Sequence, residues 1–548
     1  MTAELIPSEA EEVLGREDGL TTEAVSRGVG TTVVPLRSWI AVLGASLGAF
    51  MAMLETEVVN AALADVRGAV GANIDDGSWI STAYPIGEIV AIPLTGWLSR
   101  AFSTRLYLIT NAALFVAFSI ACGSVRELDQ LVVLRALQGL SGGVMVPMAF
   151  TLIITLLPEA RRPAGIALFS FTLTVSSSIG PLLGGWLTAT WGWPSIFYFT
   201  VVPGAVTIGM LWASLDREPM QLRLLGQGDW WGILTMALGL ASLQIVLEEG
   251  ERKDWFESGF IVRLAATAAI ALALFVWIEL GVKGPLINLR LLARRSFLAG
   301  AMGMFLLGVA IYGSEYMLLL YLAGVQDYSP AQIGRVLVWA ALPQLLVFPL
   351  LPLLMRKLDP RWLLVVGFAL FTASNLMNVG ITADVAAAEL VAPNLARGVG
   401  QALLLVPLSV LAVAGIETSQ AASASALLTI MHNLGSAVGI ASLESFLIRR
   451  EQLHFYRLSE EVSVFEQDTR QRLDQLVQYF LGHGATDSTL AWREAVLAVG
   501  QAVQQQANVM AFADTFYVLG AIMLVGLATT VLFRRPASSE AAKAATAH

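Results

Sequence analysis

Charged residues are scarce in this sequence, and cysteine and histidine are scarcer still. Charged side chains make up 14% of the 548 residues and hydrophobic ones 56%, so a water-soluble domain with an ordinary charged surface is excluded. The single cysteine, Cys122, has no second cysteine with which to form an internal disulfide. The four histidines and this cysteine show no metal-ligand spacing, so we expect no metal site, no cofactor and no embedded enzyme centre. No basic patch of the kind that binds nucleic acid is visible.

Long hydrophobic runs dominate the chain instead. Each is about 20 residues long, enough to cross a bilayer core of ~30 Å as a helix. The predicted spans are 38–61, 79–98, 105–123, 131–156, 164–188, 195–214, 229–248, 260–280, 297–322, 331–355, 362–382, 392–415, 421–447 and 510–533. Fourteen spans leave both termini on one side of the lipid bilayer, and the arginines and lysines of the short loops gather on that side. We therefore predict an all-α polytopic membrane protein with both termini in the cytoplasm.

An internal repeat predicts two related bundles. A shift of 259 residues aligns Gly139 with Gly398 and Gly180 with Gly439, in order across two consecutive spans of each half. Many transporters consist of two such bundles around a site at the middle of the membrane. The simplest architecture is two six-helix bundles separated by a pair of extra helices.

The domain boundaries follow from these spans. We predict an acidic cytoplasmic tail at 1–37, a six-helix bundle at 38–214, two inserted transmembrane helices at 229–280, a second six-helix bundle at 297–533 and a cytoplasmic tail at 534–548. The first tail lacks the basic start of a signal peptide, so we expect the first span to be kept. The second bundle includes a polar loop at 449–508, expected on the periplasmic side as two amphipathic helices. These helices either pack on the rim of the transporter or bind a partner.

Charged residues inside the spans are candidates for function, because a charge at the middle of a bilayer costs ~2.5–3.5 kcal/mol on insertion scales. The candidates for proton coupling are Glu55, Glu57, Glu88, Arg135 and Glu315. A buried carboxyl group favours its neutral form, which suits a group that loads a proton on one side of the membrane and releases it on the other. The alternative for each residue is a structural hydrogen bond or ion pair. The sequence does not indicate which acid pairs with Arg135.

Further polar residues are candidates for substrate contact or proton relay. These residues are Gln138, Arg397, His432 and Asn433. A single histidine on a helix of small residues is more often a structural hydrogen-bonding group. The short cytoplasmic loop after the second span carries Arg100 and Arg105, which either form a latch between moving bundles or only satisfy the positive-inside rule.

Small residues interrupt the fifth span. Gly180, Pro181, Gly184 and Gly185 lie inside a segment long enough to cross the membrane. Glycines let a neighbouring helix approach its backbone, and a Gly-Pro pair lets a helix bend. The segment is therefore either a gate or an ordinary kinked packing helix. With its repeat partner near Gly439, it is typical of half of a symmetric gate.

Four ordered motifs carry a family resemblance. They are MLETEVVNAAL at 53–63, IPLTGWL at 92–98, LRALQG at 134–139 and IGPLLGG at 179–185. Over about residues 38–535 the chain resembles the major facilitator superfamily, in particular its fourteen-span drug:proton antiporter branch and the EmrB-type multidrug exporters of Gram-negative bacteria. The last motif is similar to the antiporter signature of the family.

The resemblance implies a mechanism and roles for some residues. It implies alternating access, proton influx as the driving force, Arg135 as the proton-coupling arginine and IGPLLGG as the gating segment. Glu55 stands where the first-span motif usually has aspartate, and Arg100 and Ser103 replace the usual aspartate and glycine of the basic loop. Glu57 and Glu88 are additions to the subgroup pattern. The resemblance leads us to expect export of small amphipathic drugs across the bacterial inner membrane.

The resemblance also implies partners. The implied partners are a periplasmic membrane-fusion adaptor and an outer-membrane channel, for which the loop at 449–508 is a natural docking surface. An alternative on the same fold is a dedicated exporter of one metabolite, fatty acid or siderophore. A passive channel fits less well, because a channel should lack the repeat and the antiporter motif.

Overall fold

The computed structural model describes residues 34–530 other than 227, 283–284, 464 and 485–486. Of the predicted tails, residues 1–33 and 534–548 lie outside this range. The described residues form helices joined by turns, without a strand among them, which confirms the all-α prediction. Thirteen of the described helical segments are long and apolar enough to cross a membrane. The predicted second span is a 24-residue helix that is not among the thirteen and that carries Glu88 and Arg100.

The first bundle comprises the helices before residue 215. They are α2 (Leu36–Ala61), α3 (Leu63–Ala69), α4 (Ile74–Gly77), α5 (Trp79–Phe102), α6 (Thr104–Cys122), α7 (Leu128–Gly142), α8 (Met145–Leu156), α9 (Arg162–Trp191), α10 (Ser195–Tyr198) and α11 (Val201–Ser214). Together α7 and α8 make one candidate span, as do α10 and α11. We call this group the N-bundle.

The inserted pair and the second bundle follow. After the short α12 (Arg223–Gly226), the inserted helices are α13 (Trp230–Glu249) and α14 (Gly259–Gly281), joined by the 3-10 turns η2 (Glu251–Lys253) and η3 (Trp255–Glu257). The second group, here called the C-bundle, comprises η4 (Leu289–Ala293), α15 (Arg295–Gly324), α16 (Pro330–Lys357), α17 (Pro360–Met377), η5 (Asn378–Gly380), α18 (Val391–Ala412), η6 (Thr418–Gln420), α19 (Ala421–Glu461), α20 (Gln467–Gly482) and α21 (Ser488–Thr529).

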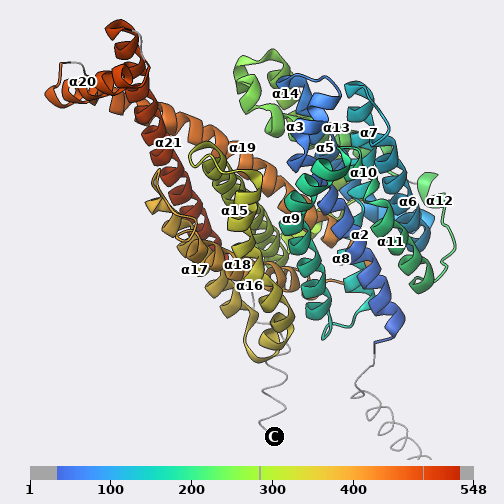
Figure 1. Cartoon of the computed structure of the whole chain (residues 1–548). Coiled ribbons are helices and arrows are strands. Elements are labelled where there is room, and N and C mark those ends of the chain that lie inside the picture. The colour runs from blue at the N-terminus through green and yellow to red at the C-terminus, as the bar shows by residue number, and fades with distance from the viewer. Residues whose placement is uncertain (1–33, 227, 283–284, 464, 485–486, 531–548) are drawn as a thin grey trace, which may run out of the picture.

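The two bundles lie side by side, with the N-bundle in blue to green and the C-bundle in yellow to red (Figure 1). Helix α20 marks one end of the molecule, while α2 begins and α21 ends at the opposite end (Figure 1). We call these the α20 end and the terminal end. Between the bundles, α9 packs on α16 and α18, while α5 and α8 pack on α19. The inserted helix α13 packs on both α5 and α19.

The polar loop predicted at 449–508 has a different form from the one expected. Helices α19 and α21 are 41 and 42 residues long and continue far beyond the predicted spans, and α20 joins their tips. At 1.5 Å per residue, each long helix is about 60 Å in length, twice the thickness of the bilayer core. One separate amphipathic helix is present here rather than two, because the second predicted helix is the first part of α21.

Candidate functional site

A buried ion pair lies inside the N-bundle. Glu55 of α2 and Arg135 of α7 are both fully buried, and the Arg135 Nη1 atom lies 3.7 Å from Glu55 Oε1. Gln138 connects them: its side-chain amide donates to Glu55 Oε1 at 2.9 Å, and its carbonyl oxygen accepts from Arg135 Nη1 at 2.8 Å. Arg135 and Gln138 are three residues apart on α7, a spacing that places both side chains on one helix face. The structure thus identifies Glu55 as the acid that pairs with Arg135.

Helix α5 holds the guanidinium group from the other side. Arg135 Nε donates to the Ile80 carbonyl oxygen at 3.2 Å, and the guanidinium carbon lies 4.7 Å from the centre of the Tyr84 ring. This approach depends on Gly139, since a Cβ atom there would lie 2.1 Å from the Tyr84 carbonyl oxygen. A cation over an aromatic face gains further electrostatic stabilisation. The arginine is therefore fixed by three helices: α2, α5 and α7.

Two polar atoms of this network have no hydrogen-bond partner among the described residues. They are Glu55 Oε2 and Arg135 Nη2, and both are buried. A buried polar atom without a partner is energetically costly. Protonation of Glu55 would remove its charge from the pair and leave Arg135 with Gln138 and Ile80 as its polar contacts. The network can therefore change its internal pairing with one proton.

A second set of charged side chains lies between the bundles. Glu88 of α5 accepts a hydrogen bond from the Asn433 amide of α19 at 3.1 Å, so this contact joins the N-bundle to the C-bundle. Glu57 of α2 lies within electrostatic range of Glu315 of α15, and two such like charges repel each other when both are ionised. Arg397 of α18 is buried and also interacts with Glu315. The three glutamates are half-buried, unlike Glu55.

Tyr312 of α15 lies within electrostatic range of all three glutamates of this second set, and the sequence interpretation missed it. It interacts electrostatically with Glu57, Glu88 and Glu315, and its ring packs edge to face on His432 at 5.7 Å. The sequence did contain one indication of its role: Tyr312 lies three residues before Glu315, so the two side chains share a face of α15. Most of the predicted polar site residues thus form two groups, one inside the N-bundle and one between the bundles.

Gln138 belongs to the first group. The sequence interpretation assigned it to the substrate cavity or to a proton relay, and the structure buries it completely between Glu55 and Arg135. A position between two charges within one bundle suits the relay role rather than direct substrate contact.

The glycine segment of α9 packs tightly on α2. A Cβ atom on Gly180 would lie 2.3 Å from Glu57 Cβ, and one on Gly184 would lie 2.6 Å from the Val58 carbonyl oxygen. Gly185 differs, because a Cβ atom there would meet nothing within 4 Å. Pro181 lies inside α9, which continues as one helix to Trp191. Two of the three glycines therefore set the distance between α9 and α2.

The repeat partners make matching contacts in the C-bundle. A Cβ atom on Gly439 of α19 would lie 2.7 Å from the Val309 Cα atom of α15. Likewise, a Cβ atom on Gly398 of α18 would lie 2.0 Å from the Ala340 carbonyl oxygen of α16, just as Gly139 lies against Tyr84 in α5. The residues aligned by the sequence shift thus make close contacts between helices at matching positions of the two bundles.

The basic loop after α5 has contacts within its own bundle. Arg100 Nε donates to the Gly96 carbonyl oxygen at 3.1 Å, and the Arg105 guanidinium carbon lies 4.6 Å from the centre of the Trp212 ring in α11. Ser103 stands between them with a positive φ of 66°, and its hydroxyl accepts from the Leu106 amide. The contacts described for the two arginines do not extend to the C-bundle, so this arrangement gives the latch interpretation no support.

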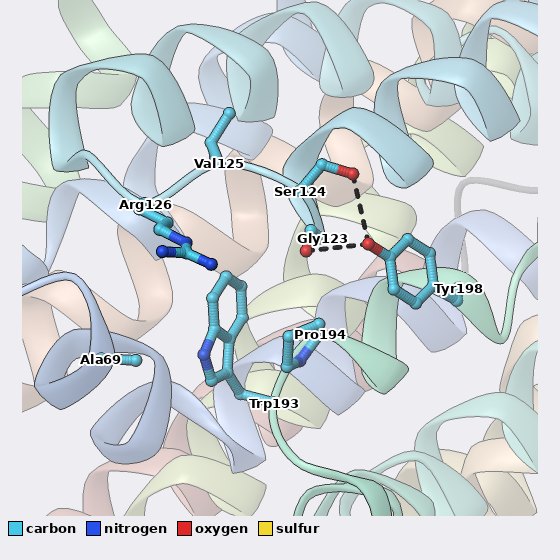
Figure 2. A pocket seen from close by; sticks show the side chains of 8 residues that line it. All are labelled: Ala69, Gly123, Ser124, Val125, Arg126, Trp193, Pro194 and Tyr198. Atoms are coloured by element: carbon cyan, nitrogen blue, oxygen red, sulfur yellow. Dashed lines mark hydrogen bonds between the residues drawn. The ribbon is translucent and has the colours of Figure 1, made fainter.

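A surface pocket of about 670 Å³ lies apart from both groups. Trp193, Tyr198 and Arg126 are among the side chains that line it (Figure 2). Tyr198 donates to the Gly123 carbonyl oxygen at 3.0 Å, a bond that ties α10 to the end of α6. The predicted site residues do not line this pocket.

Comparisons with known proteins bear on the family. A family model described as Major Facilitator Superfamily matches residues 45–440. Similar curated proteins include the fatty acid resistance protein FarB of Neisseria gonorrhoeae, 28% identical over 91% of this chain and 96% of FarB. The colistin resistance protein EmrB of Acinetobacter baumannii is also 28% identical over 91% of this chain and 96% of its own length. The multidrug export protein EmrB of Escherichia coli is 27% identical over 91% of this chain and 95% of its own length.

Solved structures share the fold. The human organic anion transporter MFSD10 aligns with a TM-score of 0.54 at 14% identity, over 90% of this chain and 99% of that one. The proton:xylose symporter XylE aligns with the same TM-score and identity, over 90% of this chain and 95% of that one. The predicted major facilitator fold with about fourteen membrane helices is therefore confirmed.

Proposed function

Because the chain belongs to the Major Facilitator Superfamily, and is thus a multi-pass membrane transporter rather than an enzyme, we propose that it is a proton-coupled antiporter that exports hydrophobic or amphipathic drugs. The export part of the proposal is supported by similarity to proteins named for multidrug export and colistin resistance. We place the transporter in the bacterial inner membrane with both termini in the cytoplasm, so that the α20 end faces the periplasm. Substrate would enter from the cytoplasm or the inner leaflet and leave by alternating access.

The observation that carries the proton-coupling proposal is the buried network of Glu55, Gln138 and Arg135. A carboxylate paired with a permanent cation in a dry bundle holds its charge, and protonation releases the cation. Since all three side chains lie within the N-bundle, protonation changes the internal packing of that bundle without a contribution from substrate. The network is thus suited to convert proton binding into a conformational preference.

The second polar group supports coupling to substrate. Glu88 bonds Asn433 across the two bundles, so a substrate or proton that removes this bond also weakens the contact between the bundles. The half-buried acids Glu57 and Glu315 come from different bundles and face the same region as Tyr312. In our proposal they contact substrate or exchange protons while the bundles alternate.

The test uses everted membrane vesicles with a pH gradient, in which added drug drives protons out through the transporter. We expect Arg135→Ala and Glu88→Gln each to reduce drug-driven proton movement strongly. Matched controls are Arg126→Ala and Glu127→Gln, which change exposed residues of the same bundle and should keep the wild-type rate. If both site variants move protons as the wild type does, the coupling assignment is wrong.

A dedicated exporter of one amphipathic compound is the second candidate function. The similarity to a protein named for fatty acid resistance supports it. A resistance panel of structurally unrelated toxic compounds, with long-chain fatty acids included, separates the two functions. Protection against several classes supports multidrug export, whereas protection against a single class supports the dedicated exporter.

We also propose that the transporter works with a periplasmic adaptor and an outer-membrane channel. The projection formed by the tips of α19 and α21 together with α20 supports this, because it carries exposed aromatic residues such as Phe465 and Tyr479 far beyond the predicted spans. Exposed aromatic side chains are typical of protein interfaces. Co-purification of the transporter with an adaptor tests the proposal directly.

A further inference from the structure

The turn between the two inserted helices holds α5 of the N-bundle. This turn, residues 249–257, begins at Glu249, whose carboxylate accepts hydrogen bonds from the hydroxyl groups of Ser78 and Thr82 at 3.2 Å each. Glu249 is only 1% exposed, and Arg252 of the same turn forms an ion pair with it. A buried carboxylate with a cation and two hydroxyl donors is well satisfied, so this side of the turn is firmly attached to α5.

The same turn also holds α19 of the C-bundle. The Trp255 indole nitrogen donates to Ser445 Oγ at 2.9 Å and to Glu251 Oε2 at 2.6 Å. Ser445 in turn donates to Glu251 Oε2, which closes a triangle of three hydrogen bonds. Two of these bonds join the turn to α19, and the third keeps the tryptophan in place.

The backbone of the turn is strained in a way that fixes the tryptophan. Asp254 and Trp255 both have positive φ angles, 54° and 47°, although neither is glycine. Residues in the left-handed region persist only where the surrounding structure holds them. Here the Trp255 amide donates to the Gly250 carbonyl oxygen at 2.7 Å, and a Cβ atom on Gly250 would lie 2.5 Å from the indole ring. The turn therefore presents its indole to Ser445 in one conformation.

The position of the turn matters because α5 and α19 belong to different bundles. Near the terminal end they contact each other directly, since a Cβ atom on Gly96 would lie 2.9 Å from Ala422 Cβ. Farther along, Asn433 bonds Glu88. At the α20 end, the described residues link α5 and α19 by hydrogen bonds only indirectly, because each helix bonds to the turn. At this end, the turn is therefore the polar connection between the N-bundle and the C-bundle, which move apart in alternating access.

We propose that the turn at 249–257 is a fastener that joins α5 to α19 at the α20 end, and that it releases Ser445 each time the bundles separate there. The inference rests on the proposed alternating-access transport. It gives the inserted helix pair a role in transport, with Glu251, Trp255 and Ser445 as positioning residues. Glu249 keeps the turn on α5 while the contact with α19 opens and closes.

Reversible cross-linking tests the fastener. In a Cys122→Ser background, Glu251→Cys and Ser445→Cys are joined with a short, reducible bis-methanethiosulfonate reagent. We expect cross-linking to stop drug-driven proton movement in vesicles and reduction to restore it. The matched control joins Tyr316→Cys to Glu444→Cys, whose side chains lie 3.2 Å apart between α15 and α19 of the C-bundle alone. This control pair should transport at the same rate with and without the cross-link.

The outcomes separate the fastener from the proposed function. If the cross-linked fastener pair transports as fast as the reduced pair, the fastener is wrong while drug–proton exchange stands. If the wild type shows no drug-driven proton movement, the proposed function fails, and a second measurement decides the fastener. Spin labels at Asp129 of the N-bundle and Arg449 of the C-bundle report the bundle separation at the α20 end. Ser445→Ala should raise the separated population about three- to tenfold, the effect of one or two lost hydrogen bonds, and an unchanged distance distribution overturns the fastener.

Discussion

Glu55 and Arg135 stabilise the N-bundle only as a pair. Glu55→Gln would leave a guanidinium group uncompensated in a dry bundle, and breaking a buried pair from one side typically costs about 3–5 kcal/mol. We expect a loss of that order in the free energy of unfolding, measured by denaturant titration in mild detergent. Arg135→Gln should give a comparable loss, because it leaves the carboxylate without its cation.

The double variant distinguishes a coupled pair from two independent residues. With both charges removed, the loss should be clearly smaller than the sum of the single losses, because no unpaired charge remains. Additive losses would contradict the pairing. Asp216→Asn is a suitable control, since it removes one partner of the exposed pair Arg37–Asp216 and should change stability little.

At the residue scale, the sequence predicted Glu55 and Arg135 as functional candidates but not how the charges are grouped, and it gave no role to Glu249, which is also buried. A charged residue inside a hydrophobic run can be recognised from the sequence alone, which is why Glu55, Glu88 and Arg135 were predicted as candidates. The partner of Arg135 comes from another helix, α2, and no local spacing encodes that contact. Tyr312 was missed for a related reason, because an aromatic residue in a span resembles any packing residue until the neighbouring acids are placed.

At the scale of a helix pair, two adjacent glycines of α9 should behave differently. Gly184→Val should abolish transport while the protein remains inserted, because its side chain would collide with the backbone of α2 at Val58. Gly185→Val should keep transport, since a Cβ atom there meets nothing within 4 Å. The measurement is drug-driven proton movement at equal amounts of membrane-inserted protein. Equal losses in both variants would show that the segment does not act through the contact with α2.

Helix ends were predicted less well than helix positions. Hydropathy marks where a helix leaves the membrane, not where the helix itself begins or ends. The predicted spans therefore end at residue 447 and begin at residue 510, whereas α19 continues to Glu461 and α21 begins at Ser488. The first part of α21 also packs through small side chains rather than large ones. Ala491 and Ala495 are fully buried, whereas Trp492 and Leu497 are exposed. Small residues allow close packing between the projecting helices, and an amphipathic pattern based on large side chains does not reveal that.

At the scale of the whole molecule, the projection and the transport core should be separable. Replacing residues 463–486 with a short Gly-Ser linker removes α20. It keeps the contacts that Asp514 of α21 makes with Arg450 and His454 of α19. Because the two polar groups of the core lie far from α20 along the helices, we expect drug-driven proton movement in everted vesicles to stay near the wild-type rate. Drug resistance of intact cells should fall, since the adaptor would lose its docking surface and exported drug would remain in the periplasm. Permeabilising the outer membrane provides the control, because it should remove the difference between the two proteins. Full resistance in cells with the shortened protein would contradict a docking role for α20, and loss of proton movement in vesicles would instead make the projection part of the transport core.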